Sequence, residues 1–220
     1  MIVTIDGPAG AGKSSAAREL ARRLEFFFLD TGAMYRAVTL AAVRQQIDWD
    51  QPDQLSRLAR SLQIDLQEDA VQLDGEDVTV PIRTLDITSL VHHAAGNPAV
   101  RQHLVQLQRA AAKGRDVVSE GRDQGTVVFP EADCKIFLTA TADERARRRL
   151  ADLQARGEDI SYQQVLLLQN LRDRRDAERS CGPLVRAADA VELVTDGLAP
   201  DAVVQRLEEI VRPRLVKHGK

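Results

Sequence analysis

Cysteine and long apolar runs are scarce in this chain, and their scarcity excludes several classes of protein. The 220 residues include two cysteines, Cys134 and Cys181, and neither has a second cysteine or a histidine at metal-ligand spacing. A zinc site or a disulfide framework is therefore not expected. No segment approaches the roughly 18 consecutive apolar residues of a membrane-spanning helix, and the first residues lack the pattern of a signal peptide. We expect a cytoplasmic protein that has no membrane partner.

An excess of positive charge is also missing. Lysine and arginine number 30 against 33 aspartates and glutamates, which gives a formal net charge of −3. Proteins that bind the nucleic-acid backbone usually have a clear excess of basic over acidic residues, so no nucleic-acid partner is expected. Hydrophobic residues at 44% and charged residues at 29% are typical of a folded soluble domain. The length suits one domain over residues 1–220, and we expect a monomer.

Lysine is the third scarce residue, because only five of the 30 basic residues are lysines and the rest are arginines. The planar guanidinium of arginine suits the recognition of phosphate and carboxylate groups. A GC-rich codon usage would produce the same skew, so composition alone does not decide between these explanations. The positions of the arginines have to decide it.

The start of the chain has the pattern of a parallel α/β domain. Residues 1–6 are rich in β-branched side chains and end at a glycine-proline pair, which predicts a buried strand. Apolar positions at helical spacing predict a helix from Ser14 and another over 32–46, with a strand over 26–30 between them. This order is typical of a central parallel sheet flanked by helices.

The middle of the chain predicts a small antiparallel sheet inserted into that domain. A short helix over 54–61 precedes three alternating runs, which contain Ile64 and Leu66, Val71 and Leu73, and Val78 and Val80. Asp74-Gly75 is a turn sequence between the second and third runs.

The rest of the chain returns to helices and core strands. Helices are expected from Thr84 to Lys113 with a break at Asn97-Pro98, over 143–154 and over 162–179, and core strands at 117–118, 135–138 and 191–194. A final helix should carry an apolar stripe made of Val203, Leu207, Ile210 and Val211.

A phosphate-binding loop follows the first strand. Residues 7–14 contain a glycine, four residues and Gly-Lys-Ser, directly after a strand and directly before a helix, which is the context that this motif requires. The backbone N–H groups and the helix N-terminus would bind phosphate, Lys13 would reach the β- and γ-phosphates, and Ser14 would ligate Mg²⁺. The candidate ATP-binding residues are Gly7, Pro8, Ala9, Gly10, Ala11, Gly12, Lys13, Ser14 and Ser15.

Two missing segments narrow the chemistry that follows nucleotide binding. The chain has no Asn-Lys-x-Asp segment for reading guanine, and no long apolar strand that ends in the aspartate of a typical ATPase; the nearest segment is 116–120. A GTPase or a motor is therefore disfavoured. Arginines beside carboxylates are present instead, as needed to hold a second phosphorylated substrate.

Two segments, residues 29–36 (LDTGAMYR) and 121–130 (GRDQGTVVFP), closely resemble those of the bacterial cytidylate kinases, in the nucleoside monophosphate kinase family. Further matches lie at 81–84, 97–101, 135–138 and 173–184, so the resemblance covers essentially the whole chain. It implies a core made of residues 1–30, 114–142 and 180–220. It also implies a monophosphate-binding region over 31–113, with the small-sheet insert at about 62–82, and a helical lid at about 143–179.

The resemblance also implies roles for individual residues. Thr31, Tyr35 and Arg36 resemble the wall of the monophosphate site, with Arg36 on the acceptor phosphate. Arg101 and Asp123 resemble the positions that read the cytosine edge. This chain has His92 where the family usually has a serine that contacts cytosine.

The remaining roles concern phosphate and sugar. Arg122 and Arg179 resemble phosphate ligands, and with Lys13 they form the candidate catalytic set. Arg172 and Asp176 resemble the pair that contacts the sugar hydroxyls. Mg²⁺ would arrive with ATP on Ser14, with Asp30 or Glu120 as alternative holders of its waters.

The implied function is transfer of a phosphoryl group from ATP to CMP or dCMP. Two alternatives stay open: a P-loop kinase for another nucleoside monophosphate such as UMP, and a nucleotide-binding module that transfers nothing. A purely structural interpretation is also open, in which Tyr35 is an aromatic side chain of the core and Arg36 lies on a solvated helix face. The arginines between residues 145 and 179 could likewise cover an exposed face; they are Arg145, Arg147, Arg148, Arg149, Arg156, Arg172, Arg174, Arg175 and Arg179.

Overall fold

The computed structural model describes residues 1–67, 70–155 and 157–217, so Arg156 of the arginine-rich segment lies outside the described residues. The chain divides into two compact units, and each is described here by itself. Unit 1 consists of Met1–Phe28 and Arg115–Lys220, and unit 2 consists of Leu29–Gly114. Of the helices in the described part of the chain, none is both long enough and apolar enough to span a membrane.

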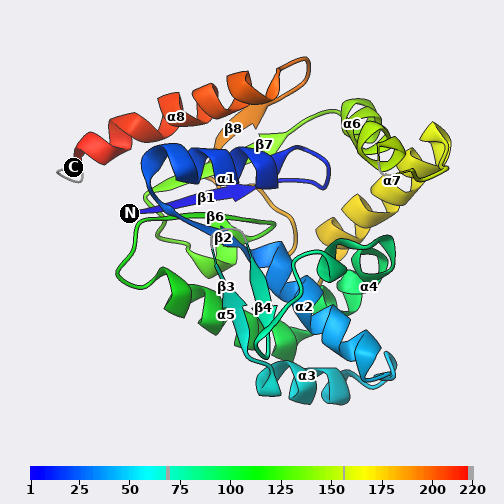
Figure 1. The fold of residues 1–220 in the computed structure, drawn as a ribbon. Coiled ribbons are helices and arrows are strands. Elements are labelled where there is room, and N and C mark those ends of the chain that lie inside the picture. The colour runs from blue at the N-terminus through cyan, green and yellow to red at the C-terminus, as the bar shows by residue number, and fades with distance from the viewer. Residues whose placement is uncertain (68–69, 156, 218–220) are drawn as a thin grey trace. The chain divides into compact units, whose positions relative to one another are not determined.

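Most of a parallel sheet belongs to unit 1 (Figure 1), and its strand β2 (Phe27–Asp30) begins there and ends with Leu29 and Asp30 of unit 2. The strand order is β2, β6 (Val117–Gly121), β1 (Ile2–Asp6), β7 (Cys134–Thr139) and β8 (Val191–Val194). β1 pairs in parallel with β6 and β7, and β7 pairs in parallel with β8. The predicted parallel sheet is confirmed. Because the chain leaves β1 in one direction and later returns on its other side, the loop after β1 lies at a switch point, where ligands bind in such folds.

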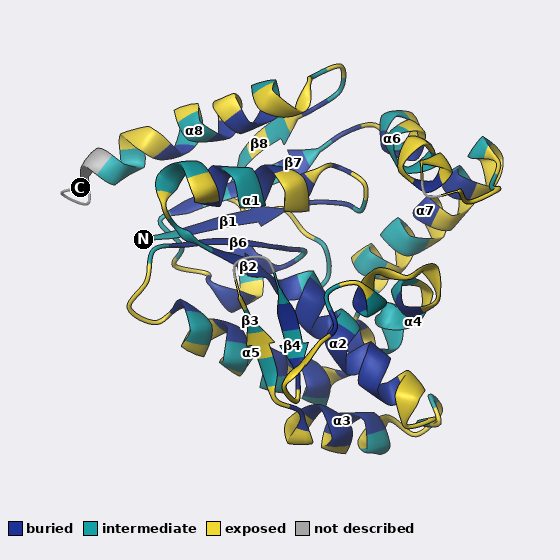
Figure 2. Cartoon of the chain, in the orientation of Figure 1, coloured by how far each residue is buried: buried dark blue, intermediate teal, exposed yellow. Residues whose placement is uncertain are grey.

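The core of unit 1 lies between this sheet and two helices. β1 and β6 are almost completely buried (Figure 2). Helix α1 (Lys13–Leu24) contributes Ala17 and Leu20, and helix α8 (Pro200–Lys217) contributes Val203, Leu207 and Val211. The predicted apolar stripe of the last helix is thereby confirmed for these three residues.

Helices α6 (Ala142–Gln154) and α7 (Tyr162–Glu178) form a pair with its own small core in unit 1, made of Ala146, Leu153 and Val165. Thr141 caps α6, and Ser161 caps α7 through a capping box with Gln164. Both predicted helices are confirmed.

Unit 2 contains four helices and the small sheet among its described residues. The helices are α2 (Thr31–Arg44), α3 (Pro52–Ser61), α4 (Leu85–Gly96) and α5 (Pro98–Ala112), and the strands are β3 (Ile64–Leu66), β4 (Val71–Leu73) and β5 (Glu76–Asp77). The predicted break between α4 and α5 is confirmed, because the Asn97 side chain accepts the N–H groups of Ala99 and Val100 and so starts a new helix.

The prediction of a third strand over Val78–Val80 is wrong. Asp74 and Gly75 have φ values of 51° and 85°, which make a tight two-residue turn, so the strand resumes at once and β5 lies at Glu76–Asp77. Val80 already takes helical backbone angles and precedes a short 3₁₀ helix, η1 (Pro81–Arg83). The alternation of Val78 and Val80 came from one buried and one exposed residue after the strand.

Candidate functional site

The loop after β1 has the backbone of a phosphate-binding loop. Gly7 has a φ of 149°, and a Cβ atom there would lie 2.0 Å from the carbonyl oxygen of Leu138, so the position excludes every other residue. Gly12 is the N-cap of α1 in a left-handed conformation, and no side chain among the described residues caps this helix. The first N–H groups of α1 are therefore not used by a side-chain cap, as an anion site requires.

Lys13 is buried at the start of α1. Its Nζ donates a hydrogen bond of 2.7 Å to the carbonyl oxygen of Pro8. Burial, followed by the positive charges of Arg122 and Arg172, lowers the pKa of Lys13 from 10.5 to about 7, although Glu120 and Asp176 act in the opposite direction. A cation held so unfavourably would be stabilised by an incoming phosphate.

Ser14, at the end of the loop, and Glu120, on β6, provide oxygen atoms that suit a hard cation. Ser14 Oγ donates a hydrogen bond of 2.8 Å to Glu120 Oε1. Hydroxyl and carboxylate oxygens are ligands that Mg²⁺ accepts directly or through water, so these residues fit a magnesium ion. The part of the chain that the structure describes holds no group of three or more His, Cys, Asp or Glu side chains that could bind a metal.

Asp6, at the carboxyl end of β1, is a buried residue that the sequence did not single out. Its two carboxylate oxygens accept hydrogen bonds from the N–H groups of Gln124 (2.9 Å) and Gly125 (2.7 Å). These residues begin a π-helical turn, η2 (Gln124–Val128), directly after Asp123. Asp6 therefore anchors the segment that carries Asp123. The only sequence signal was an acidic residue at the end of a buried strand.

We expect the free energy of unfolding to depend on pH through the ionisation of Asp6. Burial raises its pKa from 3.8 to about 6, so in this range the folded protein binds the proton more tightly than the unfolded chain. The free energy of unfolding should therefore fall as the pH rises from about 4 to 6. In urea unfolding, the difference between wild type and Asp6→Asn should change by about 3 kcal/mol between pH 4 and pH 7. A constant difference would contradict this assignment.

Arg122 and Asp176 form a largely buried ion pair in unit 1. Arg122 Nε lies 2.7 Å from Asp176 Oδ2, and Arg122 Nη1 donates to the carbonyl oxygen of Gly121. Burial would raise the pKa of Asp176, but Arg122, Arg172 and Arg179 outweigh it, so this pKa lies below its usual value. The structure thus brings three of the predicted site residues, Arg122, Arg172 and Arg179, together around a fourth, the carboxylate of Asp176.

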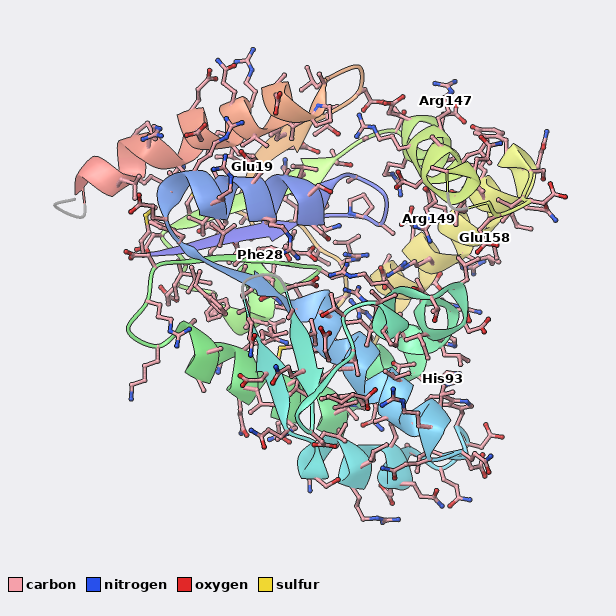
Figure 3. The ribbon with its side chains drawn as sticks, viewed as in Figure 1. Glu19, Phe28, His93, Arg147, Arg149 and Glu158 are labelled. Atoms are coloured by element: carbon pink, nitrogen blue, oxygen red, sulfur yellow. The ribbon has the colours of Figure 1, made fainter. Side chains whose placement is uncertain are left out.

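The predicted arginine-rich segment contains residues with quite different environments. Arg145 is buried, and its Nη1 donates to the carbonyl oxygen of Ala9 in the phosphate-binding loop and to Asp173 Oδ2. Arg148 binds Glu144 and the carbonyl oxygen of Thr195. Arg147 is exposed on α6 (Figure 3). Sequence position alone did not separate these roles.

In unit 2, the predicted residues Thr31, Tyr35 and Arg36 lie in the first turns of α2. Asp30 caps this helix, and Arg36 Nη2 lies 3.3 Å from both Asp30 oxygens. The Arg101 guanidinium carbon lies 5.6 Å from the centre of the Tyr35 ring, which is a cation–π distance. Tyr35 is thus a core aromatic side chain that also faces Arg101, whereas Arg36 is paired with Asp30 and does not lie on a solvated helix face.

His92 lies in α4 and packs against another histidine. Its Nδ1 is 2.8 Å from the carbonyl oxygen of Ser89, and its ring centre is 4.1 Å from that of His93. His93, labelled in Figure 3, stacks in turn on Trp49. The departure from the family pattern at His92 is thus part of an aromatic stack in unit 2.

The predicted site residues fall into two sets. Unit 1 holds the phosphate-binding loop, Ser15, Glu120, Arg122, Asp123, Arg172, Asp176 and Arg179, and unit 2 holds Asp30, Thr31, Tyr35, Arg36 and Arg101. Each set combines cations with buried carboxylates and suits a phosphorylated ligand. Three charged residues with contacts in these sets, Asp6, Arg83 and Arg145, were not among the candidates.

Comparisons with known proteins agree with the resemblance found in the sequence. The family model for cytidylate kinase matches residues 3–213. The cytidylate kinase of Rhodopirellula baltica is 50% identical over 212 residues, which are 96% of this chain and 93% of that protein. The cytidylate kinase of Pelotomaculum thermopropionicum is 51% identical over 211 residues, covering 93% of each. A solved structure of an uncharacterized protein from Eubacterium ventriosum shares the fold, with a TM-score of 0.52 at 11% identity over 97% of this chain and 98% of that chain.

Proposed function

Because this chain belongs to the cytidylate kinase family, we propose that it transfers the γ-phosphoryl group of ATP to the 5′-phosphate of CMP or dCMP. The products are ADP and CDP or dCDP. The observation that carries this proposal is the cluster of Lys13, Arg122, Arg172 and Asp176 at the phosphate-binding loop, where burial and then the charges of Arg122 and Arg172 lower the pKa of Lys13.

The acceptor in this reaction is already ionised at neutral pH, so no general base is needed. Catalysis then consists of positioning the two phosphates and stabilising the charge of the transferred group. Lys13 would contact the β- and γ-phosphates, and Arg122 and Arg179 would contact the phosphates on the acceptor side. Arg172 and Asp176 would bind the sugar hydroxyls, while Arg101 and Asp123 would read the cytosine edge.

Magnesium would be held by Ser14, with Glu120 binding its waters. When bound, the metal supplies positive charge that neutralises the phosphate oxygens and orients them. Asp30 is less suited to this role, because its oxygens accept hydrogen bonds from Ala33, Arg36 and Arg83.

Residues 143–179, which contain α7 and all but the first residue of α6, are proposed as a lid that excludes water during transfer. Their support is the link between Arg145, Asp173 and the loop carbonyl of Ala9, which connects both helices to the phosphate-binding loop. Residues 31–113 would form the acceptor-binding region. We also propose that the enzyme acts as a cytoplasmic monomer. We expect no nucleic-acid partner, which the net charge of −3 supports.

A coupled assay of ADP release tests the proposed function across CMP, dCMP, UMP and AMP. We expect turnover with CMP and dCMP and much lower kcat/KM with UMP and AMP. A preference for UMP or AMP would make the enzyme a kinase for a different monophosphate. ATP binding without transfer to any of the four would indicate a nucleotide-binding module.

A further inference from the structure

Asp6 holds the segment that carries Asp123 through both of its carboxylate oxygens. It lies at the end of β1, between β6 and β7, and is 5% exposed. Its Oδ1 accepts the N–H of Gln124 at 2.9 Å, and its Oδ2 accepts the N–H of Gly125 at 2.7 Å. These contacts span 118 and 119 positions of the chain, and both lie within unit 1.

The two N–H groups belong to a turn that needs acceptors from outside itself. The first N–H groups of a helix have no acceptor within the helix, and Gln124 and Gly125 are the first residues of η2. Further along, the bonds are internal, since the carbonyl oxygen of Asp123 accepts the N–H of Val127 at 2.9 Å. Turns of this π-helical kind are rare and frequently lie at functional sites. The carboxylate of Asp6 therefore completes the hydrogen bonding at the start of η2.

Two further contacts hold the same turn against the sheet. Ser119 Oγ, on β6, donates a hydrogen bond of 2.8 Å to Gln124 Oε1. A Cβ atom at Gly125 would lie 3.0 Å from Thr4 Oγ1, so the backbone of the turn passes close to β1. The start of η2 is thus fixed relative to β1 and β6, and Asp123, which is 3% exposed, is the residue directly before it.

Arg122, on the other side of Asp123, is held independently of Asp6. Its Nε lies 2.7 Å from Asp176 Oδ2, and its Nη1 donates to the carbonyl oxygen of Gly121. Loss of the hydrogen bonds to Asp6 should therefore displace Asp123 more than Arg122.

We propose that Asp6 is a positioning residue for base selection, because its hold on Gln124 and Gly125 sets the place of the Asp123 carboxylate. This inference rests on the proposed function, in which Asp123 reads the cytosine edge. Cytosine presents an amine there that a carboxylate can accept, whereas uracil presents a carbonyl oxygen that a carboxylate repels. The placement of Asp123 would then determine how strongly the enzyme prefers CMP over UMP.

The variant Asp6→Asn tests this role. Asparagine has nearly the same shape, but its amide nitrogen is a donor and cannot accept the second N–H. We expect the ratio of kcat/KM for CMP to kcat/KM for UMP to fall about tenfold, mainly through a higher KM for CMP. The kcat with CMP and the KM for ATP should change less than about twofold, because Arg122 and the phosphate-binding loop keep their own contacts.

Thermal unfolding at pH 7 distinguishes positioning from general support of the fold. Burial raises the pKa of Asp6 to about 6, so the ionised carboxylate is unfavourable in the folded protein. Removing this charge offsets the lost hydrogen bond, and Asp6→Asn should keep a melting temperature close to that of the wild type. A lower CMP preference in a protein of unchanged stability supports the positioning role.

The matched control is Asp133→Asn. Asp133 Oδ2 accepts the N–H of Ile2 at 2.6 Å, so this aspartate holds a backbone N–H at the opposite end of β1. The control should keep the preference for CMP over UMP. An equal loss of preference in Asp133→Asn, or a ratio within about twofold of the wild type in Asp6→Asn, would overturn the inference.

A second variant keeps the inference testable if Asp6→Asn does not fold. Ser119→Ala removes the contact from β6 to the side chain of Gln124 and leaves β1 unchanged. It loosens the same turn by one neutral hydrogen bond, so the ratio of CMP to UMP should fall about threefold. An unchanged ratio would show that the position of η2 does not control base selection, and the inference would be wrong.

Failure of this inference can be distinguished from failure of the proposed function. If the wild type prefers CMP and Asp6→Asn prefers it by the same factor, the inference alone is wrong. If the wild type phosphorylates CMP and UMP equally well, phosphoryl transfer stands, but there is no base selection for Asp6 to support and the inference is rejected. If the wild type transfers phosphate to none of the tested nucleotides, the proposed function and this inference are both wrong.

Discussion

Replacing Lys13 by methionine should lower kcat by about 10³-fold or more while making the empty protein more stable at pH 7. The activity should fall because the Lys13 ammonium is the cation at the phosphate-binding loop that would stabilise the negative charge of the phosphoryl group during transfer. Stability should rise because methionine keeps the length of the side chain and removes a buried charge that Arg122 and Arg172 repel.

The sign of the stability effect follows from the pKa of Lys13. It is about 7 in the folded protein against an ordinary 10.5, so between these values the unfolded chain binds the proton and the folded protein releases it. The free energy of unfolding contributed by Lys13 therefore rises with pH from about 7 to 10.5, and the full penalty applies below pH 7. The stability advantage of Lys13→Met in urea unfolding should be largest near pH 7 and shrink as the pH rises toward 10.

Two measurements complete this test. At pH 8, ATP binding should be accompanied by proton uptake, because the phosphates restore the charged form of Lys13; calorimetry in buffers of different ionisation enthalpy detects this. Lys113→Met, at an exposed position after α5, is the matched control and should change neither activity nor stability by much. Loss of stability in Lys13→Met at pH 7 would contradict the unfavourable burial of this cation.

The phosphate-binding loop could be predicted from the sequence because its chemistry is contiguous. Glycine spacing, the preceding strand and the following helix all lie within the first 24 residues. The contacts of Asp6 and Arg145 could not be predicted in this way. Asp6 is 118 positions from Gln124 and Arg145 is 136 positions from Ala9, and no periodic pattern carries contacts of that range.

The small sheet shows a different limit. Its existence followed from alternation and from the Asp74-Gly75 turn, but the position of its third strand did not. The φ values of these two turn residues set the register, and residues after a strand can still alternate between buried and exposed, as Val78 and Val80 do. The alternating pattern therefore predicted where the sheet lies in the chain, but it did not predict where the individual strands begin and end.

The excess of arginine over lysine can be interpreted only from the positions of the individual arginines in the structure. Arg36, Arg83, Arg122 and Arg145 each contact a carboxylate that is buried or largely buried. Arg186 and Arg206 instead pair with the exposed glutamates Glu192 and Glu209, and exposed pairs of this kind contribute little. Codon usage suffices for the second group, whereas the first group needs a functional or structural reason.

Arg122→Met should be the second severe variant, and it should damage both activity and stability. Arginines that stabilise the charge of a transferred phosphoryl group contribute about 10³ to 10⁵ to the rate, so kcat/KM for CMP should fall in that range. The change also leaves Asp176, whose side chain is only 15% exposed, without its closest partner. Breaking a buried pair in this way costs about 3–5 kcal/mol, and the retained Arg172 and Arg179 should limit the loss to less than that.

A double variant separates the two effects of Arg122. Arg122→Met combined with Asp176→Asn removes both charges of the pair, so urea unfolding should show recovery of part of the lost stability. Activity should not recover, because neither the phosphate ligand nor the sugar contact is restored. Full recovery of kcat/KM in the double variant would mean that Arg122 serves only to neutralise Asp176. Because Arg122 lowers the pKa of Lys13 and Asp176 raises it by a smaller amount, Arg122→Met alone should raise the pH at which ATP binding begins to take up a proton, and the double variant should raise it less.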